Sequence, residues 1–122
     1  MAHPMSKTKS DLSKLSPATR LVQAGRQYSE HGFVNPAVYR GSTVLFDTME
    51  ELLAYDKPYL YGRRGTPTSR AVESAIAMLE GGHASKMCPS GLAAISATLL
   101  SFLKAGDHLL MTDTCYFPTR KF

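Results

Sequence analysis

The chain has 122 residues, of which 43% are hydrophobic, and this length and composition allow a single domain with a core of ordinary size. Its formal net charge of +4 is concentrated at one end, because residues 1–26 hold five basic residues against one acidic residue while the remainder balances. A basic excess confined to a Ser/Lys/Thr-rich leader favours a solvated, poorly ordered segment over a nucleic-acid-binding face. We therefore expect residues 1–15 to be a disordered basic leader, and we expect no nucleic-acid partner.

Neither a membrane segment nor a metal site is indicated. No stretch reaches the roughly 20 apolar residues of a transmembrane helix, and the leader lacks the apolar run of a signal peptide, which predicts a cytoplasmic protein without a membrane partner. Cys88 and Cys115 lie in or beside apolar segments with no second ligand at metal-binding spacing, so we expect buried free thiols. The four histidines are scattered along the chain, which indicates no metal site.

The N-terminal half predicts short helices and an extended arm. Ser16 before Pro17 is typical of a helix start, and Gly25 is typical of a helix end. Residues 27–46 show no sustained period, which predicts an extended arm lying against a larger surface such as a second subunit. A brief helix is expected over residues 48–55. Residues 16–60 together are therefore expected to form an N-terminal arm with short helices.

The C-terminal half has a more regular apolar pattern. A helix face is predicted from residue 68 onward by the spacing of Val72, Ala75, Ile76 and Leu79, and glycines end it at 81–82. Apolar runs at residues 85–88 and 109–111 enclose a second apolar helix over residues 92–103. This order of strand, helix and strand favours a parallel, right-handed crossover, so the predicted fold class is α/β.

The predicted architecture is incomplete. One βαβ unit cannot cover both faces of a parallel sheet, and such sheets are normally buried on both sides. The last residues, from 114 to 122, enter a new helix with no stop signal. We therefore expect residues 61–122 to be the start of a larger domain, and we expect the chain to be truncated.

Three clusters carry residues suited to binding an anion or an aromatic ligand. Ser90 and Gly91 stand at a predicted helix start, where unpaired N–H groups and the helix dipole stabilise a phosphate, although Ser before Gly is also an ordinary N-cap. Residues 61–68 place a phenol and two guanidiniums in a glycine-flanked loop that suits phosphate or carboxylate oxygens, or simply a solvated surface. Tyr116 follows the second predicted strand, at the sheet edge where ligands collect, and is otherwise a core or rim residue.

These clusters, in this order, resemble the Cys/Met metabolism pyridoxal 5′-phosphate (PLP) dependent enzymes, the trans-sulfuration family, and within it the cystathionine β-lyases. The resemblance begins near residues 19–22 and is most specific at YGRRGTPT (61–68) and LEGGHASKMCPSGLAAI (79–95). It implies PLP as the cofactor and a fold type I, aspartate-aminotransferase-like large domain. The chain would then be an extended arm followed by the first βαβ portion of that domain.

The resemblance also implies a role for each candidate residue. Tyr61 and Arg63 match residues that bind the cofactor phosphate of the neighbouring subunit, which makes the active site a shared one in a homo-oligomer, expected to be a homotetramer. Ser90, Gly91 and Leu92 match the segment whose last two backbone amides hold the phosphate within the same subunit. Tyr116 matches a tyrosine that stacks on the cofactor ring and assists proton transfer, which is its expected catalytic role.

The implied reaction is β-elimination of cystathionine to homocysteine, pyruvate and ammonia, with the cofactor as electron sink. Gly62 and the Arg-Gly-Thr after Arg63 are more similar to β-lyases than to γ-lyases, and cystathionine γ-synthase, cystathionine γ-lyase and methionine γ-lyase are the alternative enzymes. The family's Schiff-base lysine, its pyridinium-pairing aspartate and its carboxylate-binding arginine are expected beyond residue 122. The chain alone is therefore expected to be inactive, and a non-catalytic remnant or docking fragment is the competing hypothesis.

Overall fold

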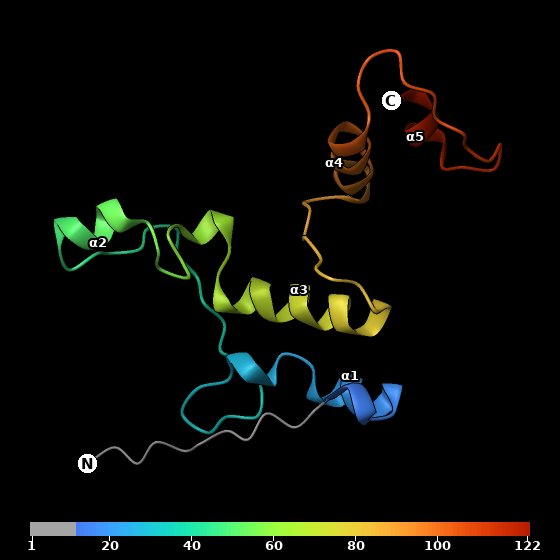
Figure 1. The fold of residues 1–122 in the computed structure, drawn as a ribbon. Helices are drawn as coiled ribbons and strands as arrows, with labels where there is room; N and C mark the ends of the chain where they lie inside the picture. The colour runs from blue at the N-terminus through green and yellow to red at the C-terminus, as the bar shows by residue number, and fades with distance from the viewer. Residues whose placement is uncertain (1–11) are drawn as a thin grey trace, which may run out of the picture. The chain divides into compact units, whose positions relative to one another are not determined.

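The structure, a computed structural model, describes residues 12–122 as short helices joined by irregular segments (Figure 1). The chain forms two compact units, Met1–Ser85 and Lys86–Phe122. Most of the predicted disordered leader, residues 1–11, lies outside the described residues, and the short 3-10 helix η1 (Leu12–Lys14) follows it. The predicted boundary between arm and large domain at residue 61 stays a prediction.

Helix α1 (Pro17–Gln23) begins where the sequence predicts. The Ser16 hydroxyl accepts a hydrogen bond from the N–H of Thr19 at 3.2 Å, and Pro17 stands in the first turn, where its missing N–H costs no intrahelical bond. Gly25, with φ of +78°, turns the chain into the 3-10 helix η2 (Arg26–Tyr28). A Cβ on Gly25 would stand 3.3 Å from that of Ala71, so the glycine also allows close packing.

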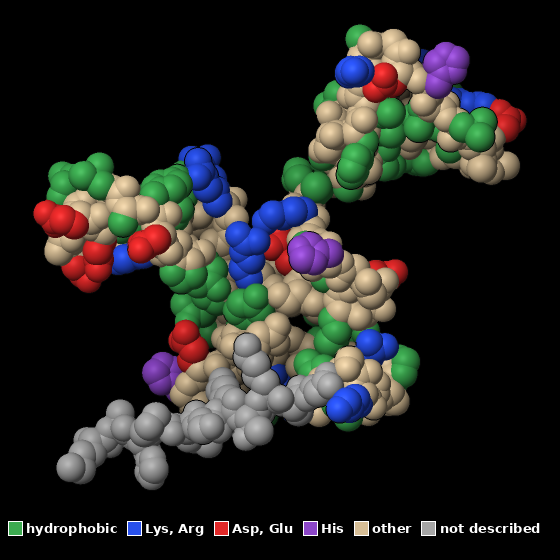
Figure 2. Space-filling model, in the orientation of Figure 1, with side chains coloured by type: hydrophobic (Ala, Val, Ile, Leu, Met, Phe, Trp, Pro, Cys, Tyr) green, Lys and Arg blue, Asp and Glu red, His purple; other side chains and the backbone are tan. Residues whose placement is uncertain are grey.

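Helix α2 (Met49–Ala54) confirms the brief helix expected over residues 48–55. The Thr48 hydroxyl caps it by accepting from the N–H of Glu51 at 3.2 Å, and Tyr55 ends it in the left-handed conformation with φ of +55°. Hydrophobic side chains gather over this helix in Figure 2, and Leu53 is 76% exposed. The helix is therefore held by its caps and by the ion pair between Glu51 and Lys57 at 2.8 Å rather than by burial.

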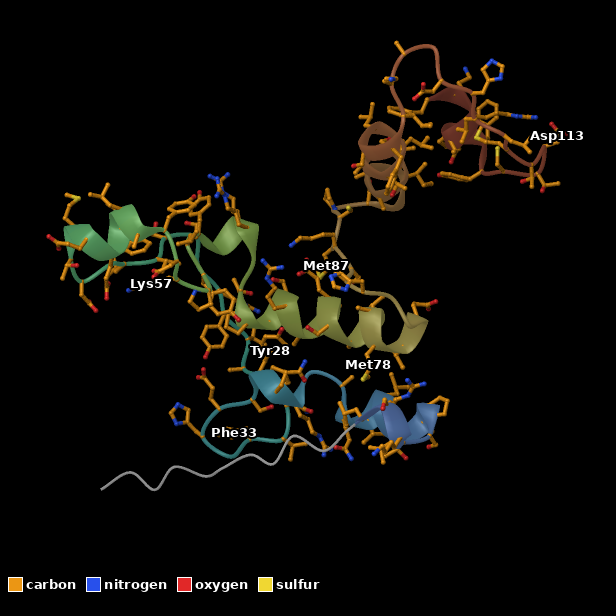
Figure 3. All side chains as sticks on the ribbon, viewed as in Figure 1. Tyr28, Phe33, Lys57, Met78, Met87 and Asp113 are labelled. Atoms are coloured by element: carbon orange, nitrogen blue, oxygen red, sulfur yellow. The ribbon has the colours of Figure 1, made fainter. Side chains whose placement is uncertain are left out.

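Helix α3 (Pro67–Glu80) confirms the predicted amphipathic helix and begins one residue earlier than expected. A capping box between Thr66 and Ser69 starts it, and Gly81, with φ of +66°, ends it. Helices α1 and η2 pack against it. Tyr28 reaches it from η2 (Figure 3), and its hydroxyl lies 2.9 Å from that of Ser74. Helix α3 is thus the element on which the arm rests.

The Lys86–Phe122 unit consists of α4 (Gly91–Phe102) and α5 (Phe117–Lys121), which pack against each other. Helix α4 confirms the second predicted apolar helix. Its N-cap is Ser90, whose side chain accepts from the N–H of Ala93 at 3.1 Å. Helix α5 corresponds to the helix that the final residues were expected to enter.

The two predicted strands are not formed in the described chain, so the α/β class and the βαβ crossover are not confirmed. Residues 85–88 and 109–111 run without regular structure, and the described residues contain only an isolated antiparallel bridge between Thr43 and Tyr61. A parallel strand takes all its hydrogen-bond partners from neighbouring strands, so an apolar run with no neighbour stays unpaired. Leu110, at the centre of the second run, is 99% exposed.

The described residues do not form the core of ordinary size that the composition would allow. Ala71 is the hydrophobic residue buried among them, together with the polar side chains of Ser29 and Glu73. Phe102 on α4 is 83% exposed. Short helices that contact only one or two neighbours cannot enclose large side chains. Within this described part, no helix combines the length and apolar character needed to cross a membrane.

Candidate functional site

Tyr61 and Arg63 form a pair at the 3-10 helix η3 (Gly62–Arg64). The Nε of Arg63 donates a hydrogen bond to the Tyr61 hydroxyl at 2.6 Å, and the guanidinium carbon lies 4.9 Å from the centre of the Tyr61 ring. The terminal N–H groups of Arg63 carry no hydrogen bond within the described chain, and the side chain is exposed. A guanidinium fixed through Nε with its outer edge open suits bidentate binding of a phosphate or carboxylate.

A second tyrosine holds the next arginine, and sequence reasoning missed it. An outer nitrogen of Arg64 donates to the Tyr55 hydroxyl at 2.6 Å, and the guanidinium carbon lies 5.9 Å from the ring centre. Tyr55 comes close to Arg64 because the left-handed end of α2 turns the chain back toward η3. The composition of residues 48–55 carries no signal for this contact, since it depends on the path of the intervening loop.

The arm fastens the turn that carries Tyr61 and Arg63. Thr43 forms an antiparallel bridge with Tyr61, and the N–H of Gly62 donates to the carbonyl of Ser42 at 2.7 Å. Segments nearly 20 residues apart in the sequence are thereby joined by backbone contacts. The sequence of residues 61–68 predicts a loop but carries no indication that the arm would bind this loop through its backbone.

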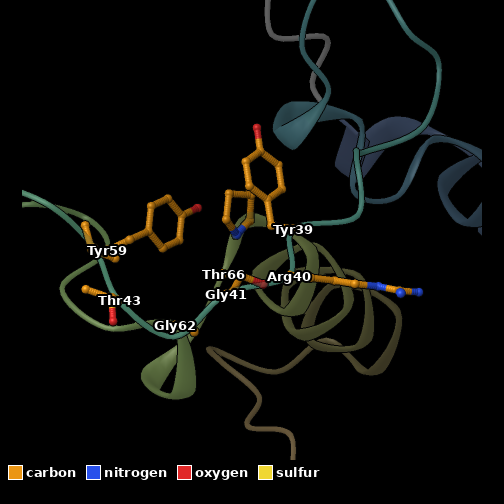
Figure 4. Close-up of a pocket in the computed structure, with 10 residues that line it drawn as sticks. Tyr39, Arg40, Gly41, Thr43, Tyr59, Gly62 and Thr66 are labelled. Carbon is orange, nitrogen blue, oxygen red and sulfur yellow. The ribbon is translucent and has the colours of Figure 1, made fainter.

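A hollow of about 260 Å³ lies beside this turn (Figure 4). Its wall includes the rings of Tyr39, Tyr59 and Pro67 together with Val44, Thr43, Thr66, Arg40 and three glycines. The Arg40 side chain points away from Tyr59 in Figure 4. Burial raises the pKa of Tyr59 above its ordinary value, so its phenol is protonated near neutral pH. The hollow therefore offers apolar walls and hydroxyls, with Arg40 as its one basic lining residue in the described chain.

Ser90, Gly91 and Leu92 form the open N-terminal end of α4. The carbonyl of Ser90 accepts a hydrogen bond from the N–H of Ala94 at 3.0 Å, and its hydroxyl accepts one from the N–H of Ala93. The N–H groups of Gly91 and Leu92 precede the first intrahelical bond and have no partner in the described chain. A Cβ built on Gly91 would meet no atom within 4 Å. The two free donors, the helix dipole and this open approach fit a phosphate.

Tyr116 lies in the same unit as these residues, at the start of α5. It is 63% exposed, and an ion pair between Arg120 and Asp113 closes the turn that carries it. The segment before it is irregular rather than a strand. No hydrogen bond joins Tyr116 to residues 90–92 in the described chain, so the crevice that it was expected to share with Gly91 stays a prediction.

The candidate residues thus form two local groups. Tyr61 and Arg63 belong to the Met1–Ser85 unit, whereas residues 90–92 and Tyr116 belong to the Lys86–Phe122 unit. Both cysteines are free, but Cys88 is exposed and Cys115 is half-buried, so the expectation of buried thiols is wrong. Cys88 is exposed because residues 85–88 do not form a buried strand. Residues 12–122 hold no group of three His, Cys, Asp or Glu side chains placed to bind a metal ion.

Known proteins similar to this chain include cystathionine β-lyases and a methionine γ-lyase. A Rhizobium johnstonii protein, provisionally named a cystathionine β-lyase, is 46% identical over 105 residues, covering 85% of this chain and 26% of its own length. The cystathionine β-lyase of Salmonella typhimurium is 41% identical, covering 85% and 28% respectively. The L-methionine γ-lyase of Porphyromonas gingivalis is 36% identical, covering 93% and 30%. The chain therefore spans between a quarter and a third of the length of these relatives.

The sequence model of one family matches residues 18–122, nearly all of the described chain. The matched range contains every candidate site residue. The chain belongs to the Cys/Met metabolism PLP-dependent enzyme family, whose cofactor is pyridoxal 5′-phosphate.

Proposed function

We propose that this chain supplies the phosphate-binding part of the PLP site in a carbon–sulfur lyase that acts on cystathionine. The observation that carries the proposal is the Tyr61/Arg63 pair, in which a 2.6 Å hydrogen bond fixes Nε and leaves the outer guanidinium edge open. A phosphate dianion is a ligand that such a fork binds in bidentate fashion. The open end of α4 supplies a second set of donors for the same chemical group.

In this proposal the two groups of residues bind two different PLP molecules, one in each of two subunits. The N–H groups of Gly91 and Leu92 hold the phosphate within the same subunit, and Tyr61 and Arg63 hold the phosphate in a neighbouring subunit. The enzyme would accordingly be a homo-oligomer, a tetramer, with shared active sites. Anchoring the phosphate fixes the orientation of the bound group, which lowers the entropic part of the reaction barrier.

Tyr116 is the residue proposed to act on the reacting part of the ligand. Its ring is exposed. In this role the ring would stack on the pyridine ring of the bound group, and the hydroxyl would hold or move a proton. The cofactor itself, once bound, supplies an electron sink for the bond-breaking steps. The other proposed site residues, Tyr61, Arg63 and 90–92, bind and orient rather than react.

The substrate is proposed to be cystathionine, cleaved on its β side to homocysteine, pyruvate and ammonia. This choice is supported by the name of the Salmonella typhimurium relative and by the sequence at Gly62. The name of the Porphyromonas gingivalis relative favours γ-elimination of methionine as the second candidate. We further propose that residues 1–122 alone bind phosphate without releasing thiol, because none of the seven lysines lies in the sequence context of the family's cofactor lysine.

A chimera tests the proposed reaction. Residues 18–122 would replace the matching segment of the Salmonella typhimurium cystathionine β-lyase, and thiol release from cystathionine and from methionine would be measured. We expect release from cystathionine to dominate, and we expect Arg63→Ala to raise the PLP concentration needed for half-maximal activity while Arg26→Ala, a control on another exposed arginine, leaves it unchanged. A chimera that releases thiol only from methionine would overturn the β-lyase proposal.

Binding to the chain alone tests the phosphate site directly. Amide resonances of Gly91 and Leu92 and the Arg63 side-chain resonance should shift on addition of inorganic phosphate or PLP. Pyridoxal, which lacks the phosphate, is the matched control and should leave them in place. Equal shifts with pyridoxal would contradict a site that recognises the phosphate.

A further inference from the structure

We propose that Ser42 and Thr43 of the arm, together with Gly62, position the Tyr61/Arg63 pair, so that Gly62 is a positioning residue for the anion site. The inference rests on the proposed function, because it assigns a cause to the geometry of the residues that bind phosphate there. All of these residues lie in the Met1–Ser85 unit.

Backbone contacts hold the arm against the turn. The N–H of Gly62 donates to the Ser42 carbonyl at 2.7 Å, a short bond for an amide donor, and Thr43 pairs with Tyr61 as a β-bridge. Tyr61 and Arg63 are the two residues adjacent to Gly62. The bond from the Gly62 N–H therefore fixes the peptide plane between Tyr61 and Gly62, which adjoins the Cα of Tyr61 and precedes Arg63 by one residue.

The contact is possible only because residue 62 has no side chain. A Cβ at this position would stand 1.9 Å from the carbonyl oxygen of Gly41 and 2.8 Å from its carbonyl carbon. Both obstructing atoms belong to the backbone, so no rotation of a side chain relieves the overlap. The φ of Gly62 is not in the left-handed region, so the requirement for glycine is steric rather than conformational.

Displacing the arm would release the pair. The hydrogen bond from Arg63 Nε to the Tyr61 hydroxyl joins side chains two positions apart, so it needs the tight backbone of the 3-10 turn. In that turn the N–H of Gly65 donates to the Gly62 carbonyl at 3.2 Å. Moving the arm away removes the Ser42 acceptor and frees this turn. The cost then falls on anion affinity, because a loose guanidinium must be ordered at the moment of binding.

The substitution Gly62→Ala tests the inference, and Gly41→Ala is its matched control. A Cβ on Gly41 meets nothing within 4 Å, and its φ also lies outside the left-handed region, so both variants remove one glycine but only one creates an overlap. Three NMR readouts would be followed in the whole 122-residue chain. Hydrogen exchange of the Arg63 Nε–H without phosphate shows whether its bond to the Tyr61 hydroxyl is formed. The change in chemical shift of the same Nε–H on adding inorganic phosphate shows binding. The α3 amide resonances show whether the chain is folded.

We expect the wild-type chain and Gly41→Ala to keep a protected Arg63 Nε–H and to bind inorganic phosphate equally. Gly62→Ala should lose that protection and bind phosphate about fivefold or more weakly while the α3 amides stay in place. Protection and affinity that survive in Gly62→Ala would overturn the inference. Rapid exchange of the Gly62 amide in the wild-type chain would overturn it as well, even if the alanine variant fails to fold.

Loss of the proposed function gives a different pattern. If phosphate shifts no resonance of the wild-type chain while the Arg63 Nε–H is protected in it and exposed in Gly62→Ala, the anion site is refuted and the positioning by the arm stands.

Discussion

The hydroxyl of Thr68, in the first turn of α3, accepts a hydrogen bond from the backbone N–H of Tyr39 at 2.8 Å. The same hydroxyl donates to the carbonyl of Ala37 at 2.9 Å. The Thr68 side chain thereby pairs with backbone groups of the arm that would otherwise need a neighbouring strand. Thr68 therefore fixes the arm at Ala37 and Tyr39, just before the arm reaches the 61–64 turn.

Substituting Thr68 by valine should destabilise the arm. Valine keeps the shape of threonine but loses both hydrogen bonds, so we expect the free energy of unfolding to fall by about 1–3 kcal/mol. Urea unfolding and amide exchange at Tyr39 would measure the change. Thr68→Ser, which keeps the hydroxyl, should retain most of the stability, and equal losses in the two variants would show that the methyl group rather than the hydrogen bonds matters.

Substitutions at Ser90 should separate folding from anion binding. Ser90→Ala removes the N-cap of α4 and should lower the stability of that helix by about 1 kcal/mol, measured as faster exchange of the Ala93 amide. Ser90→Asp also caps the helix and should keep the exchange slow. Its negative charge beside Gly91 should nevertheless weaken phosphate binding. An aspartate variant that binds phosphate as the wild-type chain does would place the anion elsewhere.

The pair formed by Tyr39 and Glu30 should make stability fall at alkaline pH. The Tyr39 hydroxyl donates to the Glu30 carboxylate at 2.6 Å, and this bond raises the pKa of Tyr39 above its ordinary value of 10.0 because it favours the protonated phenol. A pKa that is raised on folding gives stability that is complete below pH 10 and is lost as the pH climbs through the folded-state value.

Titration of the Tyr39 ring by ¹³C NMR would test this directly. In Glu30→Gln, the loss of the carboxylate should bring the Tyr39 pKa closer to its ordinary value, and the alkaline loss of stability should become smaller. An unchanged Tyr39 titration in that variant would contradict the assigned cause.

Removing the Tyr55 hydroxyl should free Arg64 without affecting its neighbour. Tyr55→Phe keeps the ring but removes the acceptor that lies 2.6 Å from Arg64, so the side-chain N–H groups of Arg64 should exchange faster. The Nε–H of Arg63 should be unaffected, because it donates to the Tyr61 hydroxyl. Side-chain ¹⁵N NMR resolves the two arginines, and simultaneous loosening of both would mean that the two pairs act as one.

The helices could be predicted from the sequence because their signals are local. Ser16, Thr48 and Ser90 each cap the helix that follows within three residues, and Gly81 ends α3 at the position where the apolar period stops. Capping bonds need no distant partner. These elements therefore form in the described chain as the pattern indicates.

The predicted strands and two features of the site depend on distant residues. Residues 85–88 and 109–111 have the composition of strands but no neighbouring strand to complete them. The Tyr55/Arg64 pair and the overlap between Gly62 and Gly41 arise from how the chain folds back on itself. The sequence could name Tyr61, Arg63 and residues 90–92 only through their order and family resemblance, and the active site shared between subunits stays a prediction.

The apolar run at residues 109–111 affects how this chain behaves at high concentration. Leu110 projects almost its whole side chain into solvent, and the backbone around it has no ladder partner in the described residues. Such a segment can pair edge to edge with the same segment of another molecule. The net charge of +4 opposes that encounter at low ionic strength, and added salt removes the protection. Dilute, low-salt buffer is therefore the condition under which this chain should remain monodisperse.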